Sequence, residues 1–363
     1  MIYLDYAATT PVDGEVLDAM LPYLKSNFGN PDSVHGAGRA AARAVNEARA
    51  RVADTLGVSP LEVYFTSGGT EADNWAVQRI GTGSAAVSAV EHAAVLEGAK
   101  LRKGGFSLIP ATAGGVITKD ALLSALAPET GLVAVMAANN ETGTVQPIKE
   151  ISEACKERGI LLFSDCVQAA GYLDLKELTG LCDAVALSGH KIYAPKGTGA
   201  LVVRKGVAIS PLIAGGEQER SLRGGTLNVA GIVGFSLALE KAQREREKHT
   251  LRVRALRDLF EEKLKAALGG RVTAGGENRL PNISHLTFGD APDALLAKLD
   301  LAGLCASGGA ACSAHSALPS HVMLAMGRTE KEAKRGVRFS FGRETTEEET
   351  LKAVEIIKEC LQK

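Results

Sequence analysis

The feature that most constrains the fold is an alternation of short apolar runs with amphipathic stretches between residues 60 and 210. Seven runs have the length and apolar content of buried strands, and helix-like stretches such as residues 148–158 separate several of them. The predicted strands are residues 63–66, 85–90, 106–110, 132–137, 160–164, 184–188 and 200–204. Repeated strand, helix, strand order is typical of an α/β fold with a mostly parallel sheet and right-handed crossovers.

The parts of the chain on either side of this block have a different pattern. Residues 36–56 predict a long amphipathic helix, and residues 229–267 predict one or two long helices. The C-terminal part predicts strands at residues 283–288 and 337–341 and helices at residues 292–300 and 346–361. We therefore expect a large domain over residues 13–250 and a small α+β domain that combines residues 1–12 with residues 251–363.

Composition argues against several classes of protein. The net charge is −1, so bulk electrostatics gives no reason to expect direct binding to nucleic acid or to an anionic membrane. No apolar run reaches the length of about 18 residues that a membrane span needs, and the first residues do not resemble a signal peptide. The six cysteines include no CxxC pair, so neither a zinc site nor a disulfide framework is predicted. We expect a cytoplasmic protein with reduced thiols.

Polar residues follow the predicted strands at the ends where ligands bind in open α/β sheets. A glycine turn, Ser67-Gly68-Gly69-Thr70, follows the first strand, and its backbone N–H groups and the Thr70 hydroxyl suit a phosphate. The later strands are followed by His92, by Asn139 and Asn140, by Asp165 and Gln168, and by Ser188, His190 and Lys191. Each of these residues alone is a weak indication of a binding site. Together they are a stronger one, because five strand ends place them at one edge of the sheet.

Together these residues have the chemistry of a pyridoxal 5'-phosphate (PLP) site. Lys191 can form a Schiff base with the aldehyde of this cofactor, and Asp165 can hold the proton of its pyridinium ring. The flat ring of His92 can stack on the pyridine. Donors for the phosphate are available from Thr70, Ser188 and His190.

Ordered motifs along nearly the whole chain resemble the class V aminotransferases, a family of fold-type I PLP-dependent transferases. Within that family, the motifs are most similar to those of the NifS/IscS-type cysteine desulfurases. The matching segments are residues 3–11, 28–31, 66–74, 91–92, 139–141, 165–168, 188–191, 224–226 and 339–343. The resemblance implies a large domain with a mostly parallel mixed sheet, a smaller α+β C-terminal domain, and a homodimer.

The resemblance also implies a role for each matching residue. Lys191 would hold PLP covalently and move the substrate proton, Asp165 would pair with the pyridinium, and Gln168 would donate to the ring O3′. His92 would stack on the ring and is a candidate catalytic residue. The phosphate would be bound by Gly69, Thr70, Ser188 and His190, and by Thr226 of the partner subunit. Asn140 and Arg343 would hold the carboxylate of the substrate, and the rigid fork of arginine suits that role.

Cys312 separates a desulfurase from other members of the family. It lies in a run of small residues, 306–314, which on its own is an ordinary glycine-rich connector. The resemblance makes Cys312 the thiol that takes sulfur from L-cysteine as a persulfide and leaves L-alanine. A sulfur-acceptor protein, either an iron–sulfur scaffold or a thiolation enzyme, would then receive the sulfur. Two hydroxyl residues of the family's usual pattern are replaced here by Gly308 and Ala310.

Two alternatives stay open at this point. A selenocysteine lyase or a small-amino-acid transaminase would share the Lys191 site, but a transaminase does not need Cys312. A non-catalytic protein of the same fold would only bind a partner. Loss of Lys191 or Asp165 would mark such a protein, and both residues are present.

Overall fold

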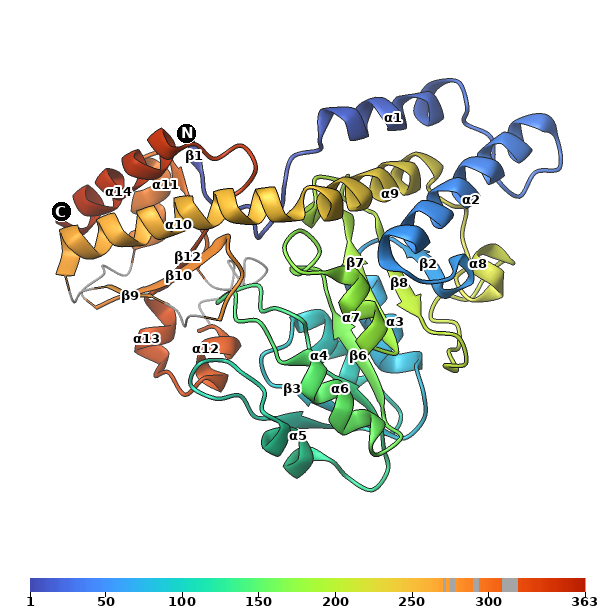
Figure 1. The fold of residues 1–363 in the computed structure, drawn as a ribbon, viewed down its shortest axis with the longest axis horizontal. Helices are drawn as coiled ribbons and strands as arrows, with labels where there is room; N and C mark the ends of the chain where they lie inside the picture. The colour runs from blue at the N-terminus through green and yellow to red at the C-terminus, as the bar shows by residue number, and fades with distance from the viewer. Residues whose placement is uncertain (270–271, 275–277, 290–293, 309–318, 363) are drawn as a thin grey trace.

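The computed structural model describes residues 1–269, 272–274, 278–289, 294–308 and 319–362. Cys312 lies outside the described residues. The chain forms a larger region around a seven-stranded sheet and a smaller region around a three-stranded sheet, and a long helix connects the two (Figure 1).

The sheet of the larger region contains all seven predicted strands, each within a few residues of its predicted bounds. They are β2 (Val63–Thr66), β3 (Ser84–Ser88), β4 (Phe106–Ile109), β5 (Thr130–Ala134), β6 (Leu161–Asp165), β7 (Ala184–Ser188) and β8 (Gly199–Val203), in the spatial order β2-β8-β7-β6-β5-β3-β4. Strand β8 is antiparallel to both of its neighbours, and the remaining strands share one direction. The predicted mixed, mostly parallel sheet is confirmed, and six strands have their carboxyl ends at one edge.

Helices cover both faces of this sheet, which explains why its strands are apolar on both sides. They are α2 (Gly36–Leu56), α3 (Gly69–Arg79), α4 (Ala93–Lys100), α5 (Lys119–Ala125), α6 (Ile148–Lys156), α7 (Leu175–Leu181) and α9 (Val229–Arg244). Adjacent residues on β2 belong to different cores: Phe65 packs with Phe235, whereas Tyr64 packs with Trp75. Alternation of side chains along a strand produces this arrangement.

The predicted helical stretch at residues 229–267 forms two helices rather than one. Helix α9 ends at Arg244, and α10 (Arg246–Leu268) begins after Glu245, whose backbone angles are not helical. Helix α9 packs against α1 (Gly14–Lys25) and α2 in the larger region, and α10 continues into the smaller region (Figure 1).

The smaller region draws on both ends of the chain. Its antiparallel sheet has the order β12-β10-β9, formed by Gly336–Ser340, Ile283–Phe288 and Val272–Ala274, and β1 (Ile2–Tyr3) pairs in parallel with β11 (Leu304–Cys305). The helices are α10, α11 (Leu295–Leu301), α12 (His321–Ala325), α13 (Glu330–Lys334) and α14 (Glu347–Gln362). Leu4 shares a core with Phe260 and Phe339. We propose the domain division at residues 13–250, with 1–12 joined to 251–363, on the basis of these two cores. Helices α12 and α13 bridge the division, since Val322, Met323, Met326 and Ala333 pack in the core of the larger region.

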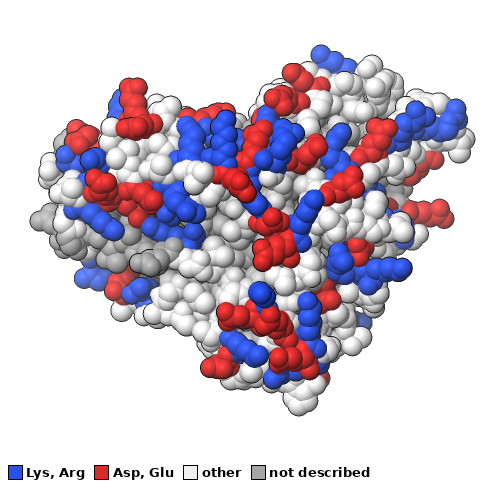
Figure 2. Space-filling model, in the orientation of Figure 1, with Lys and Arg blue, Asp and Glu red and all other residues white. Residues whose placement is uncertain are grey.

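The surface mixes charges of both signs. Figure 2 shows acidic and basic side chains interspersed over the visible face, in keeping with the net charge of −1. Among the described residues, no helix is both long enough and apolar enough to cross a membrane.

Candidate active site

A cavity of about 710 Å³ opens at the edge of the large sheet where the six parallel strands end. It is lined by residues that follow β2, β3, β5, β6 and β7, by the N-terminal segment Ala7–Thr9, and by Arg338 and residues 319–321 of the smaller region. The predicted site residues in its lining are Gly69, Thr70, His92, Asn140, Asp165, Gln168, Ser188, His190 and Lys191. Thr226 and Arg343 lie outside this lining.

The N-terminus of α3 forms one end of the cavity. Gly68 has a φ of 153°, a backbone conformation that favours glycine, and it turns the chain from β2 into α3. A Cβ on Gly69 would come within 2.9 Å of Val167 Cγ2, so the helix end lies directly against the turn after β6. No side chain caps the first turn of α3, and the hydroxyl residues Thr70 and Ser188 line the same end of the cavity. Free N–H groups, hydroxyls and the helix dipole together suit an anion such as phosphate.

Lys191 follows β7 in a short 3₁₀ helix, Gly189–Lys191. Its Nζ donates hydrogen bonds to the carbonyl oxygens of Ala7 at 2.6 Å and Ala8 at 2.8 Å, so the N-terminal segment holds the amine at the cavity wall. Tyr193 has a φ of 67° although it is not glycine, and its backbone N–H donates to Thr10 Oγ1 at 2.8 Å. The turn that carries Lys191 is therefore fixed on both sides by the start of the chain.

Asp165 ends β6 at the base of the cavity and is 5% exposed. Its Oδ1 accepts the backbone N–H of Val167 at 2.8 Å. Burial raises the pKa of Asp165, while the charge of Lys191, and that of His92 in its protonated form, act to lower it. Gln168 Nε2 donates to the carbonyl oxygen of Ala7 at 2.8 Å. A buried carboxyl in this place can hold a proton on a basic ring nitrogen.

Burial favours the neutral form of two of the histidines that line the cavity. His92 begins α4, where its Nδ1 accepts the backbone N–H of Ala94 at 3.1 Å, and burial lowers the pKa of its ring. His190 Nδ1 lies 3.2 Å from Thr9 Oγ1, and burial lowers the pKa of His190 to about 4. Because Nδ1 of His92 is an acceptor, its Nε2 carries the proton.

Arg338 is a cavity residue that the sequence analysis missed. It lies on β12, is 1% exposed, and donates from Nη1 to the Asn140 carbonyl and from Nη2 to Asp5 Oδ1, both at 2.8 Å. Its Nε is buried without a hydrogen-bond partner among the described residues. A guanidinium in a cavity wall can bind a carboxylate in bidentate fashion. The available signal was a charged residue between Val337 and Phe339 in an otherwise apolar strand.

Arg343 is not part of the cavity lining. Its Nη1 is 3.3 Å from Asp13 Oδ2, and its guanidinium carbon is 4.4 Å from the centre of the Tyr193 ring. Its backbone N–H donates to the Tyr193 hydroxyl at 2.6 Å. Asp13 is also paired with Lys241 at 2.9 Å. In this structure Arg343 joins the smaller region to the loop that follows Lys191.

Thr226 is exposed and follows a strained turn. Residues 219–221 have φ values of 45°, 61° and 62°, a left-handed conformation that residues other than glycine rarely adopt. The Glu219 carboxylate is buried and accepts hydrogen bonds from Arg49 at 2.5 and 2.8 Å and from the Phe65 N–H at 3.0 Å. These contacts attach the turn to α2 and β2. They therefore restrict the position of the exposed segment that contains Thr226.

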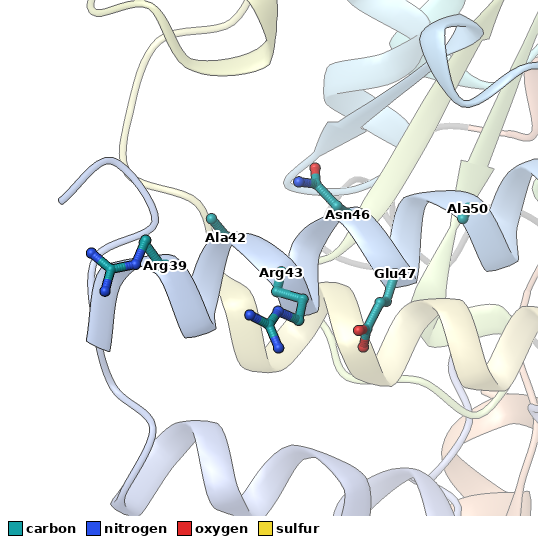
Figure 3. A pocket seen from close by; sticks show the side chains of 6 residues that line it. All are labelled: Arg39, Ala42, Arg43, Asn46, Glu47 and Ala50. Carbon is teal, nitrogen blue, oxygen red and sulfur yellow. The ribbon is translucent and has the colours of Figure 1, made fainter. Parts of the chain in front are cut away.

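A second hollow lies along the outer face of α2. Figure 3 shows its lining, in which Arg39, Arg43 and Glu47 project from the helix near Ala42 and Ala50. The charged residues here are exposed and mixed in sign. This hollow is a surface feature of the helix, and the cavity at the sheet edge is the candidate active site.

The family comparison agrees with the geometry of the cavity. Residues 2–352 match the model of the aminotransferase class-V family. The chain is 43% identical to the cysteine desulfurase IscS of Methanosarcina thermophila, over 100% of this chain and 92% of that protein. It is 40% identical to the cysteine desulfurase IscS of Dictyoglomus turgidum, over 100% of this chain and 95% of that protein.

Solved structures give the same relationship. A NifS-like protein aligns with a TM-score of 0.90 and 34% identity, over 99% of both chains. The NifS-like protein of Rickettsia africae aligns with a TM-score of 0.91 and 31% identity, over 100% of both chains. The chain therefore belongs to the aminotransferase class-V family and, within it, to the cysteine desulfurases of the NifS and IscS type.

Proposed function

We propose that this protein is a cysteine desulfurase, which converts L-cysteine to L-alanine and transfers the sulfur to Cys312. The family relationship over the whole chain supports the reaction type. The observation that carries the role of Cys312 is the position of its described neighbours. On one side, Ser307 exchanges two backbone hydrogen bonds with Arg338, at 2.7 and 3.1 Å. On the other side, residues 319–321 line the cavity.

The segment after Cys312 is attached to the cavity by side-chain contacts. Ser320 Oγ donates to Glu141 Oε2 at 2.5 Å, and His321 Nε2 lies 2.9 Å from the Glu91 carbonyl oxygen. The two acceptor residues, Glu91 and Glu141, belong to loops at the carboxyl ends of strands in the large sheet. Described residues on both sides of the segment that includes Cys312 therefore lie in the cavity lining or next to it, which supports this thiol as the one that reaches the substrate.

The cavity residues fit PLP, the cofactor of this family. The uncapped N-terminus of α3, with Thr70 and Ser188, provides a phosphate site, and the close approach of Gly69 leaves no room for a larger residue. Asp165 would hold the ring nitrogen, and Lys191 would bind the aldehyde carbon covalently. The neutral ring of His92 would stack on the cofactor. When bound, PLP supplies an electron sink for the bond changes at the α-carbon of the substrate.

We assign the substrate carboxylate to Arg338 together with Asn140. Arg338 lines the cavity and Arg343 does not. Each guanidinium has one ion pair, Arg338 with Asp5 and Arg343 with Asp13, and the Nε of each is buried without a hydrogen-bond partner among the described residues. A guanidinium in the cavity wall can reach a bound carboxylate, and its rigid fork suits bidentate binding. Carboxylate binding by Arg338 would orient the amino acid so that Lys191 can remove the α-proton and return it.

Sulfur transfer then needs the thiolate of Cys312. The thiolate attacks the sulfur of the substrate, a sulfur–sulfur bond forms, and the bond between sulfur and the β-carbon breaks. The electron pair of the broken bond stays with the β-carbon, which takes up a proton and becomes the methyl group of alanine. The sulfur remains on Cys312 as a persulfide and can pass to a thiol of an acceptor protein, such as an iron–sulfur scaffold or a thiolation enzyme.

We also propose that the active unit is a homodimer. Thr226 is exposed and lies on a tethered turn, so it is available to the phosphate site of a second subunit. The segment around α1 and the start of α2 exposes large apolar side chains, with Phe28 79% and Val34 89% exposed. Exposed apolar residues of this size are expected to be covered by a partner surface. Sedimentation at micromolar concentration should give a dimer, and an active monomer would contradict the shared site.

The proposed reaction is tested by incubating the purified protein with L-cysteine and a reductant. The account predicts visible absorption from bound PLP, and release of L-alanine and sulfide in equal amounts. Equal turnover of amino acids that lack a thiol, with a keto acid as co-substrate, would favour a transaminase. Turnover restricted to L-selenocysteine would favour a selenocysteine lyase.

A further inference from the structure

Three carboxyl groups buried at or near the cavity influence one another electrostatically. Asp73 is on α3, Glu91 is in the loop that follows β3, and Asp165 is at the end of β6. They are 2%, 1% and 5% exposed, respectively, and Asp73 and Asp165 are part of the cavity lining. Two of the three therefore face any molecule bound there, and all three are removed from solvent.

The hydrogen bonds available to these carboxyl groups are few. Glu91 Oε1 accepts the backbone N–H of Met136 at 2.6 Å, and Asp165 Oδ1 accepts that of Val167 at 2.8 Å. Glu91 Oε2 and Asp73 Oδ1 are buried without a hydrogen-bond partner among the described residues. Asp73 has no salt bridge to a described residue either. An ionised carboxylate buried in this way would carry a large desolvation cost.

The three carboxyl groups differ in the charges that act on them. Burial raises the pKa of Asp73, and the charges of Asp165 and Glu91 raise it further. Burial also raises the pKa of Glu91, with a further contribution from Asp165. The cation that acts on the cluster, Lys191, acts on Asp165, and so does His92 in its protonated form. No group of three or more His, Cys, Asp or Glu within the described ranges is arranged to bind a metal ion.

We propose that Asp73 and Glu91 are neutral carboxylic acids in the folded protein, and that Asp73 is a positioning residue that keeps Asp165 as the single ionised carboxylate of the cavity floor. A protonated acid has an O–H donor, and a donor next to a carboxylate stabilises the negative charge. This inference rests on the proposed function, because it is through Asp165 that Asp73 would act on the ring nitrogen of PLP.

Two substitutions at one position separate a neutral acid from a charged one. Asp73→Asn is neutral and keeps N–H donors, whereas Asp73→Leu has a similar size and no donor. The readout is the pH titration of the visible absorption of bound PLP in the holoenzyme, whose midpoint depends on the charge at the ring nitrogen. We expect the PLP absorption of the Asp73→Asn variant to titrate with the same midpoint as that of the wild type. In Asp73→Leu, Asp165 becomes more basic and draws the proton from the ring, so the midpoint should rise by about one pH unit.

The alternative outcomes are distinct. If Asp73 is ionised, both substitutions remove a negative charge, and both midpoints should shift downward together. That result would overturn the positioning role. An Asp73→Leu variant whose PLP absorption has the same midpoint as the wild type would also overturn it. If Asp73→Leu does not fold, the Asn variant and the infrared measurement below still decide the protonation state.

The infrared spectrum of the same proteins tests protonation independently of PLP. The C=O stretch of a carboxylic acid lies apart from the amide bands. Asp73→Asn and Glu91→Gln should each remove part of this signal near neutral pH, whereas Asp18→Asn, at an exposed position on α1, should not. An unchanged signal in the Asp73 variant would overturn the proposal. If the wild type shows no PLP absorption, it is the proposed function that fails, and the infrared result still stands.

Discussion

The floor and the rim of the cavity are built in different ways. The floor comes from loops directly after parallel strands, with Asp165 at the end of β6 and Lys191 just past β7. The rim comes from the smaller region, where Arg338 lies inside an antiparallel strand and residues 319–321 follow the segment that contains Cys312. In the proposed function, the floor would hold the cofactor, while the rim would bind the substrate and carry the thiol that takes its sulfur.

The largest effect is expected from the floor. Lys191→Ala should abolish release of alanine from L-cysteine, because the residue proposed to bind PLP and to move the α-proton is lost. Borohydride reduction of the wild type followed by peptide mapping should place the cofactor on Lys191. A cofactor found on another lysine, or substantial activity in the variant, would break the assignment of the floor.

The rim can be tested with two arginines that are five residues apart. Arg338→Lys keeps a positive charge but loses the bidentate fork, and we expect kcat/KM for L-cysteine to fall by about 100-fold, as charged hydrogen bonds worth about 3 kcal/mol are lost. The matched variant Arg343→Lys should mainly reduce stability, because Arg343 contacts Asp13 and Tyr193. Steady-state kinetics would contradict this account if the Arg343 variant lost substrate affinity and the Arg338 variant did not.

The stability of the smaller region, which provides the rim, should depend on pH and decrease in acid. Glu261 on α10 accepts two hydrogen bonds from Arg279 at 2.7 Å and one from Ser284 Oγ at 2.6 Å. Burial acts to raise the pKa of Glu261, but these contacts outweigh it and hold the pKa below its usual 4.5. The contribution to stability is therefore present above pH 4.5 and is lost as the pH falls through the lower folded value.

Glu261→Gln should accordingly lower the free energy of unfolding by about 3 kcal/mol near neutral pH. The difference from the wild type should narrow in acid, where the wild type also loses the charge. Chemical unfolding at a series of pH values measures both quantities. A difference that stays constant with pH would mean that the ion pair contributes little to the fold.

The smallest effect is expected at Thr226, which we propose completes the phosphate site of the partner subunit. Thr226→Ala should weaken PLP binding about tenfold, the loss of one hydrogen bond to a charged group. If Thr226 serves the partner's site, mixed dimers of Thr226→Ala and Lys191→Ala subunits contain one site with both residues intact. These mixed dimers should bind PLP at that site with wild-type affinity. Weakened binding at every site of the mixture would place Thr226 in its own subunit's site.

Much of the floor could be predicted because strand ends leave a signal in the sequence. Short apolar runs bounded by polar residues marked all seven strands, and the residues after them, such as His92, Asp165 and Lys191, line one cavity. The direction of β8 was not predictable, since an antiparallel buried strand has the same apolar composition as a parallel one.

The rim was harder to predict because its residues depend on tertiary packing. Arg338 and Arg343 lie in one motif, and the motif alone does not say which guanidinium faces the cavity. The carbonyl oxygens of Ala7 and Ala8, which hold Lys191, leave no signal, because backbone contacts do not depend on the side chain. The role of Cys312 stays a prediction, since this residue lies outside the described part of the chain.

The central claim, that sulfur passes from L-cysteine to Cys312, is tested most directly by mass spectrometry after treatment with L-cysteine. The account predicts that a peptide containing Cys312 gains the mass of one sulfur atom in the wild type. Cys312→Ser should keep PLP and bind L-cysteine, yet release alanine more slowly by orders of magnitude, because a hydroxyl stays protonated where a thiolate is needed. Cys305→Ser is the matched control and should retain the adduct on Cys312. Alanine release at the wild-type rate by Cys312→Ser, or an adduct only on another cysteine, would contradict the account.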